Sequence, residues 1–353
     1  MKTLTTHFLI RRWAAVAAAL GAAAVLRAGG GACTPALGGL TLVIPAGGAR
    51  ALSLPLAGTP SARGAAFGRV SAVGPDFVEV AGADWTPGLF LAAVNPYYLR
   101  LRTGAAAGRV FPVESNTATR LQLDTDGADL TAAGGAVAPG DAWELVPADT
   151  LASLLPAEIL QGGAAAAEAD NVQVWSGSAF RTYYFNTIRR RWEEAAHPEA
   201  DCGALVLRPD RGFLIVRRGR TELRLTLIGR VAEVAPRYWH ARPGVTLLAT
   251  GLPVDTTLGA LGLQNRAGGW LGATDRLAAF TDADLVEIGP GADPKLFFFD
   301  GASGHWRLAG DAAGHDQDGF KLTAGTPLMI HRLATPPSAA DALILMPLPA
   351  EFR

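Results

Sequence analysis

The sequence predicts an all-β, mostly antiparallel protein, with a small N-terminal β-barrel or sandwich followed by two related β-modules and few short helices. Short runs of alternating apolar and polar residues recur between residues 67 and 146, with turn residues between them. The 42 glycines and 23 prolines fit many tight turns between short strands. One stretch, 169–218, also returns as 283–332, and such a repeat defines the modules of a fold.

The two copies of the repeated stretch share an offset of 114 residues, from 169 to 283. The matching segments are 169–174 with 283–288, 183–186 with 297–300, Trp192 with Trp306, and 214–218 with 328–332. A slightly different offset links 147–151 to 253–258. The regions we expect are a signal peptide at 1–32, an N-terminal β-domain at 33–144, a first module with bridging strands at 145–251, a second module at 252–335, and a poorly ordered tail at 336–353.

The first elements are strands, because apolar residues alternate with small or polar ones at 40–44 and 52–56. The N-terminal domain continues with short strands up to residue 146. Each module then begins with a short helical turn, at 150–155 and at 258–263. Asp149 or Thr150 supplies the N-cap of the first turn, because both side chains accept bonds from free backbone N–H groups.

Between the helical turn and the first repeated strand, residues 161–170 leave two readings open. The Ala-rich run is compatible with a helix, whereas Gly162 and Gly163 favour a loop. Hairpin turns follow at 186–190 and 300–304, and Asp-Gly makes the second a strong turn signal.

Net charge and composition narrow the class of protein. The formal net charge is −1, and 18% of the residues are charged against 49% hydrophobic. This balance excludes a disordered chain and lacks the strongly basic surface of a nucleic-acid binder. We expect no nucleic-acid partner.

The N-terminus has the pattern of an export signal. Lys2, Arg11 and Arg12 precede an apolar run at 14–26, and small residues follow at 28–32. The run is shorter than the roughly 20 residues of a membrane-spanning helix, so cleavage before Cys33 is expected. The two arginines are either a twin-arginine signal or part of an ordinary n-region. The expected location is periplasmic, outer-surface or extracellular, with no transmembrane segment after cleavage.

The chain has two cysteines, Cys33 and Cys202. In an oxidising compartment the two thiols can form a disulfide. Cys33 is alternatively the lipidated first residue of a lipoprotein, although Gly30 stands where a lipobox normally has Leu. The third alternative is two unpaired thiols.

The repeated motifs form a recognisable set. Ala-Asp-x-Val-x-Val is followed by an aromatic triplet with Asn or Asp, a Trp, and a Gly turn into an apolar strand that ends in Arg-Arg. This set resembles a family of uncharacterised exported bacterial all-β proteins that have a signal peptide and a duplicated module. The resemblance implies export and the fold, and it brings no known activity or catalytic residue. The second copy departs from the pattern, because Pro327 replaces the aromatic and His331 the first Arg.

Arginines and aromatic residues gather in the first copy and make a candidate ligand surface. Such a combination suits anionic polymers or sugars. The alternative is a solvated hairpin tip with aromatic residues in the core. The candidate residues are Tyr184, Arg189, Arg191, Trp192 and Arg217.

One acidic loop has the spacing of calcium ligands. Asp124, Asp126 and Asp129 occupy positions 1, 3 and 6, although an EF-hand requires Gly at position 6. The segment 316–319 is a second acidic loop of this kind. The alternative is an Asx-stabilised turn between strands. We expect no cofactor.

These observations favour a non-enzymatic, exported protein of structural or adhesive type. The alternatives are a module that binds carbohydrate or an anionic polymer, and a hydrolase with an unrecognised site. No Gly-x-Ser-x-Gly motif occurs, and no two histidines have the His-x-x-x-His spacing of a metal pair. His305 and His331 stand at repeat positions held by Arg191 and Arg217, which suggests strand surfaces. The partner is then a cell-surface polysaccharide or another envelope protein.

Overall fold

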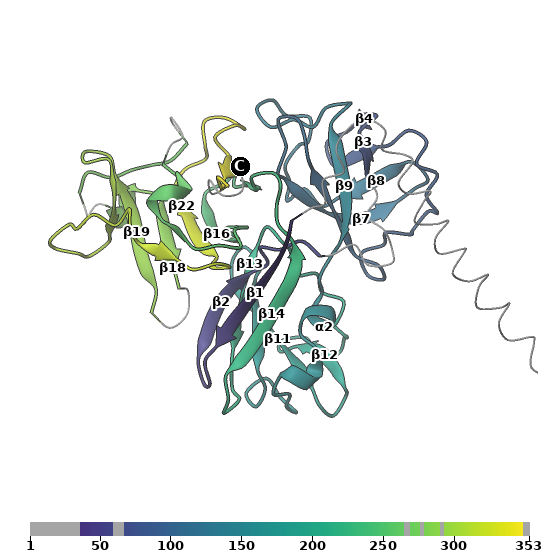
Figure 1. Ribbon diagram of the computed structural model, residues 1–353, viewed down its shortest axis with the longest axis horizontal. Helices are drawn as coiled ribbons and strands as arrows, with labels where there is room; N and C mark the ends of the chain where they lie inside the picture. The colour runs from purple at the N-terminus through teal and green to yellow at the C-terminus, as the bar shows by residue number, and fades with distance from the viewer. Residues whose placement is uncertain (1–35, 59–66, 265–268, 276–278, 290–292, 349–353) are drawn as a thin grey trace, which may run out of the picture. The chain divides into compact units, whose positions relative to one another are not determined.

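The computed structural model describes residues 36–58, 67–264, 269–275, 279–289 and 293–348 (Figure 1). The chain divides into two units, Met1–Ala36 and Leu37–Arg353, and every element below belongs to the second. The fold is mostly antiparallel β, as the sequence predicted. The expected signal peptide and Cys33 lie outside the described residues. No helix in the described part of the chain is both long and apolar enough to cross a bilayer.

A seven-stranded sheet occupies the part of the chain that we expected to form the N-terminal domain. Its neighbouring strands are all antiparallel, in the order β3-β9-β6-β7-β8-β5-β4. Leu99, Leu121 and Trp143 are buried at the centre of its core. The strands are β3 (Phe67–Arg69), β4 (Ala72–Val73), β5 (Phe77–Glu79), β6 (Tyr97–Leu101), β7 (Val110–Asn116), β8 (Arg120–Leu123) and β9 (Ala142–Pro147).

The first module contains a five-stranded sheet and a separate two-stranded ribbon. The sheet order is β12-β11-β10-β13-β2, and the ribbon pairs β1 with β14. Leu42, Ile215 and Leu225 share one core, so apolar faces of both sheets bury each other. The strands are β1 (Leu37–Ile44), β2 (Ala49–Ser53), β10 (Asn171–Trp175), β11 (Phe180–Asn186), β12 (Arg191–Glu194), β13 (Gly212–Val216) and β14 (Leu223–Arg230).

The predicted N-terminal β-domain at 33–144 therefore begins too early in the sequence. The two opening strands, β1 and β2, pair with β14 and β13 of the first module rather than with the N-terminal sheet. The seven-stranded sheet is thus an insertion in the chain between β2 and β10. Local alternation revealed the two strands, but it carries no information about partners that are more than 150 residues away.

The second module repeats this arrangement. Its five-stranded sheet has the order β16-β22-β18-β19-β20, and β15 pairs with β23 in a separate ribbon. Val286, Trp306 and Ile330 lie in its core. The strands are β15 (Arg237–Trp239), β16 (Gly244–Leu248), β17 (Thr256–Thr257), β18 (Leu285–Ile288), β19 (Lys295–Asp300), β20 (His305–Leu308), β21 (Lys321–Leu322), β22 (Leu328–Arg332) and β23 (Leu343–Leu345).

The described part of the expected tail, residues 336–348, contains β23 and so is not the poorly ordered segment that we predicted. Ile344 and Met346 are buried in the second core, and β23 pairs along β15. The prediction was based on the proline-rich composition of the tail. It missed a strand of only three residues, 343–345, which completes the ribbon with β15.

The register of the last repeated strand also corrects the offset. Val172 faces Ile215 in the first sheet, and Val286 faces Ile330 in the second. The offset thus rises from 114 at Val172 to 115 at Ile215, because the loop after Trp306 is one residue longer than the loop after Trp192. Arg332, not His331, therefore stands in the place of Arg217.

Short helical turns precede the first repeated strand of each module. The first, α2 (Leu151–Leu154), begins at Thr150, whose side chain and that of Ser153 form a capping box. The second module has η2 (Gly259–Leu261) at the expected place, as a 3₁₀ turn. Residues 161–170 form a loop rather than a helix. Two further turns are η1 (Ala157–Ile159) and α3 (Ala279–Asp282).

Candidate functional site

The aromatic residues of the predicted ligand surface lie inside the first module. Trp192 is 2% exposed and Tyr184 5% exposed. Trp192 packs edge-on against Phe185, with ring centroids 6.2 Å apart. A ring stacks on a sugar only if one face is open, so burial removes both residues from the surface on which we placed them.

Arg189 and Arg191 of the same candidate surface bind a carboxylate of their own module. Their guanidinium groups donate to Glu193 Oε1 over 3.0 and 2.8 Å, while Asn186 and Tyr184 donate to Oε2 over 2.9 and 3.1 Å. Burial of the carboxyl raises its pKa, but these four hydrogen bonds outweigh burial and lower the pKa of Glu193 to about 2. Glu193 is a charged anchor of the β11–β12 hairpin.

Arg217, the last candidate, pairs with the buried Asp170. The same carboxylate accepts backbone N–H bonds from Gln161 at 2.8 Å and from Arg218 at 2.6 Å. Both side chains of the pair are buried, with 8% and 1% of their surface exposed. Asp170 thus joins the loop before β10 to the end of β13.

Asp284 and Arg332 occupy the equivalent positions in the second module. The Asp284 carboxylate accepts from the backbone N–H of Leu271 at 3.1 Å and of Leu333 at 2.9 Å, and Arg332 Nε lies 3.6 Å away. Burial raises the pKa of Asp284. Arginine at this position is therefore a structural element of both modules, not a ligand of a second molecule.

The acidic loop at 124–129 does not converge on one point. Asp124 and Asp126 each bind Arg208 at 3.0 Å, and Asp126 also binds Arg211. Asp129 instead accepts from the backbone and hydroxyl of Thr131 at 2.8 and 2.6 Å. Arginine side chains supply the positive charge here, and the hydrogen bond from Asp126 N to Asp124 Oδ1 at 3.0 Å is that of an Asx turn.

A cavity of about 220 Å³ adjoins these arginines. Trp175, Phe213 and Leu207 lie on its apolar wall, and Arg208, Arg211 and Asp126 on its polar one. Arg211 Nη1 is buried and has no hydrogen-bond partner within the described residues. A few polar groups on an apolar wall are typical of small-molecule pockets, although most of those are larger, with volumes of roughly 300–1,000 Å³.

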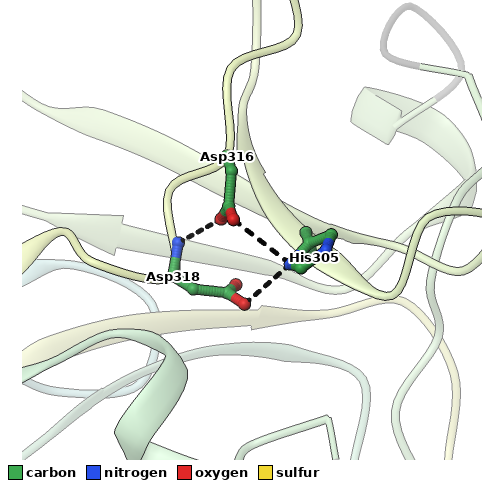
Figure 2. Close-up of side chains that lie close together, drawn as sticks. All are labelled: His305, Asp316 and Asp318. Carbon is green, nitrogen blue, oxygen red and sulfur yellow. Dashed lines mark hydrogen bonds and ion pairs between the residues drawn. The ribbon is translucent and has the colours of Figure 1, made fainter.

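A second group of polar side chains lies at the start of β20 in the second module (Figure 2). His305 Nδ1 is 2.9 Å from Asp318 Oδ2 and 3.3 Å from Asp316 Oδ2. The second oxygen of each carboxylate is fixed by the backbone, because Trp306 N donates to Asp318 Oδ1 and Asp318 N to Asp316 Oδ1, both at 2.8 Å. The hydrogen bond with Asp318 raises the pKa of His305.

His305, Asp316 and Asp318 are the one group of metal-ligating side chains that converges in the described part of the chain. The sequence pointed to the loop 316–319 and to His305 separately and did not join them. Ten residues separate Trp306 from Gln317, and those after the end of β20, 309–316, are irregular, so no fixed spacing signals the approach of the two aspartates to His305.

Cys202 is half-buried, and burial raises the pKa of its thiol. Because Cys33 lies outside the described residues, the disulfide between the two stays a prediction.

Comparison with known proteins gave no match: no family model, no curated protein and no solved structure is similar to this chain.

Proposed function

We propose that the chain is an exported β-protein of the cell envelope or extracellular space, of structural or adhesive type and without catalytic activity. One observation carries this proposal: the charged side chains at repeated positions bind inside their own module. Asp170 with Arg217 and Asp284 with Arg332 do so at equivalent places. Side chains used in this way fix loops to strands and make rigid bodies, which suits a scaffold.

We infer further that the two modules are copies of one unit. Support comes from the common strand order and from matched backbone bonds. Gly163 N donates to Phe185 O at 3.2 Å, and Ala273 N donates to Phe299 O at 3.0 Å. The N-terminal pattern of Lys2, Arg11 and Arg12 ahead of an apolar run supports export.

The first test is to express the full chain in a Gram-negative host and fractionate the cells. We expect a shortened protein in the periplasm, envelope or medium, with the N-terminus reported by mass spectrometry. Full-length protein confined to the cytosol contradicts export. The same spectrum reports any lipid on Cys33 and any bond from Cys33 to Cys202.

The cavity beside Arg211 favours a second candidate function, binding of a sugar or of an anionic polymer. A glycan array distinguishes the two. A purely structural protein gives no specific signal on the array. Binding at the cavity gives a signal that disappears in Thr246→Phe, which fills the cavity from its wall. Trp192→Ala is unsuitable for this test, because loss of a buried Trp destabilises the module instead of removing a ligand contact.

A further inference from the structure

We propose that His305, Asp316 and Asp318 form a binding site for a divalent transition-metal ion of the Zn²⁺ class. The ligand atoms are His305 Nδ1 and the Oδ2 atoms of the two aspartates. The imidazole nitrogen is a borderline donor that suits Zn²⁺ better than Ca²⁺ or Mg²⁺, and Zn²⁺ also binds carboxylate oxygens. The inference is independent of the proposed scaffold function.

The distances between the ligand atoms fit an ion of this size. Zn²⁺ binds nitrogen and oxygen at about 2.0–2.2 Å, and two tetrahedral ligands at that distance are about 3.3 Å apart. His305 Nδ1 lies 3.3 Å from Asp316 Oδ2 and 2.9 Å from Asp318 Oδ2. All three ligand atoms lie within 4.8 Å of one another. Shifts of the side chains would bring the three atoms to tetrahedral spacing.

The carboxylates are already oriented toward a common point. Asp318 Oδ1 is held by Trp306 N and Asp316 Oδ1 by Asp318 N, each at 2.8 Å, which leaves only the Oδ2 atoms to face the imidazole (Figure 2). Hydrogen bonds from outside the ligand set are what orient the ligands of metal sites. The three side chains are 45%, 52% and 37% exposed, so an ion can enter and keep water as its remaining ligands.

The first module offers an internal comparison for these positions. Trp192 O accepts from Cys202 N as Trp306 O accepts from Gln317 N, so the two loops align. Asp201 then matches Asp316, and its Oδ1 accepts from Gly203 N at 2.8 Å in the same turn. The other two ligands have no counterpart there.

Arg191 stands at the position of His305, and Gly203 at that of Asp318. Arg191 donates to Pro198 O at 2.9 Å and so, together with Arg189, which donates to the same oxygen at 3.0 Å, fixes its own loop. The second module thus has His305 in place of Arg191, which removes the bond to the loop, and Asp318 in place of Gly203. These two residues add metal ligands beside Asp316, the aspartate that both modules share. An ion pair between a protonated His305 and the aspartates would fill the same space, and the following experiment separates the two.

The test is isothermal titration of the full exported chain with ZnCl₂ at neutral pH. We expect one Zn²⁺ per chain. Loss of a supporting residue outside the ligand set weakens metal binding about 10- to 100-fold, so loss of a ligand should weaken it at least as much. His305→Arg and Asp318→Gly, which install the residues of the first module, should both do so.

His315→Ala is the matched control. His315 Nδ1 also lies 2.8 Å from a carboxylate, that of Asp311, but among the residues that the structure describes no second carboxylate completes a ligand set. Its substitution should leave the Zn²⁺ affinity unchanged. Circular dichroism verifies that all variants are folded, and Co²⁺ in place of Zn²⁺ should give visible absorption in the wild type and in His315→Ala only. Absence of Zn²⁺ binding in the wild type, or equal affinity in folded His305→Arg, would overturn the proposal.

Discussion

The buried pair of Asp170 and Arg217 allows a direct test of how a module is held together. Asp170→Asn keeps the shape of the side chain but leaves the guanidinium, only 8% exposed, without a counter-charge. In the wild type, Gln161 N donates to one oxygen of the Asp170 carboxylate and Arg218 N donates to the other. The NH₂ group of the substituted amide therefore faces an N–H donor in either orientation. Breaking a buried ion pair from one side costs about 3–5 kcal/mol, and we expect this range.

Asp284→Asn is the matched variant in the second module, and we expect it to cost less. Arg332 Nε lies 3.6 Å from the Asp284 carboxylate. Arg332 Nε and Nη1 have no hydrogen-bond partner within the described residues. Because the wild-type pair is looser, less is lost, and the difference should amount to at least one hydrogen bond, about 1 kcal/mol.

Native-state hydrogen exchange measures both costs, because it reports the opening free energy of each module separately. The relevant amides are those of β10 for Asp170→Asn and of β18 for Asp284→Asn. Asp170→Asn combined with Arg217→Met should restore part of the stability, since an apolar side chain removes the unpaired charge. A cost below about 1 kcal/mol for Asp170→Asn, or a larger cost for Asp284→Asn, would refute the reasoning.

Three further predictions concern buried groups of the two modules. Glu193 has a pKa of about 2 when folded, below its ordinary 4.5. Its contribution to stability is therefore present above pH 4.5 and is lost as the pH falls toward 2. In urea titrations, the difference in unfolding free energy between the wild type and Glu193→Gln should shrink over that range. Burial lowers the pKa of His240 to about 4, from 6.5. The neutral ring therefore stabilises the fold above pH 6.5, and this benefit is lost as the pH falls from 6.5 to 4. His240→Gln should remove that part of the acid dependence, and an unchanged slope of unfolding free energy against pH contradicts the prediction. Trp192→Ala and Trp306→Ala should each cost about 3–5 kcal/mol and lower the melting temperature, and a folded Trp192→Ala of wild-type stability would show that the ring is not in the core.

The sequence predicted strands and turns well where the signal is local. Alternation located β1 and β14, whereas the strand expected at 52–56 overlaps β2 only at its last two residues; Thr150 caps the helical turn as expected. The sequence did not predict the pairing of β1 with β14. The burial pattern of a strand tells which face is apolar, whereas the identity of its neighbour depends on the path of the whole chain.

The candidate site was harder to predict for a similar reason. Arg217, Tyr184 and Trp192 have the composition of a ligand surface, but composition does not distinguish an exposed aromatic from a core one. Burial decides that difference, and it depends on which sheet packs over the face. The loop that brings Asp316 and Asp318 to His305 differs in length from the corresponding loop of the first module. The repeat therefore did not indicate that these three residues are neighbours.

The two modules share one framework and differ at one hairpin face. Asn186 and Glu193 of the first hairpin correspond to Asp300 and Arg307 of the second, so the charge at the centre of the face is reversed. Arg307 Nε lies 3.5 Å from Asp300, whereas Glu193 is held by two arginines.

Asp170 and Asp284, in contrast, keep the same residue type, partner type and backbone bonds. The Asp–Arg framework is thus the same in both modules, whereas the charge of the hairpin face is reversed. The framework residues therefore set the stability of each body. The faces of β11–β12 and β19–β20, including His305 at the start of β20, are where the side chains of the two modules differ.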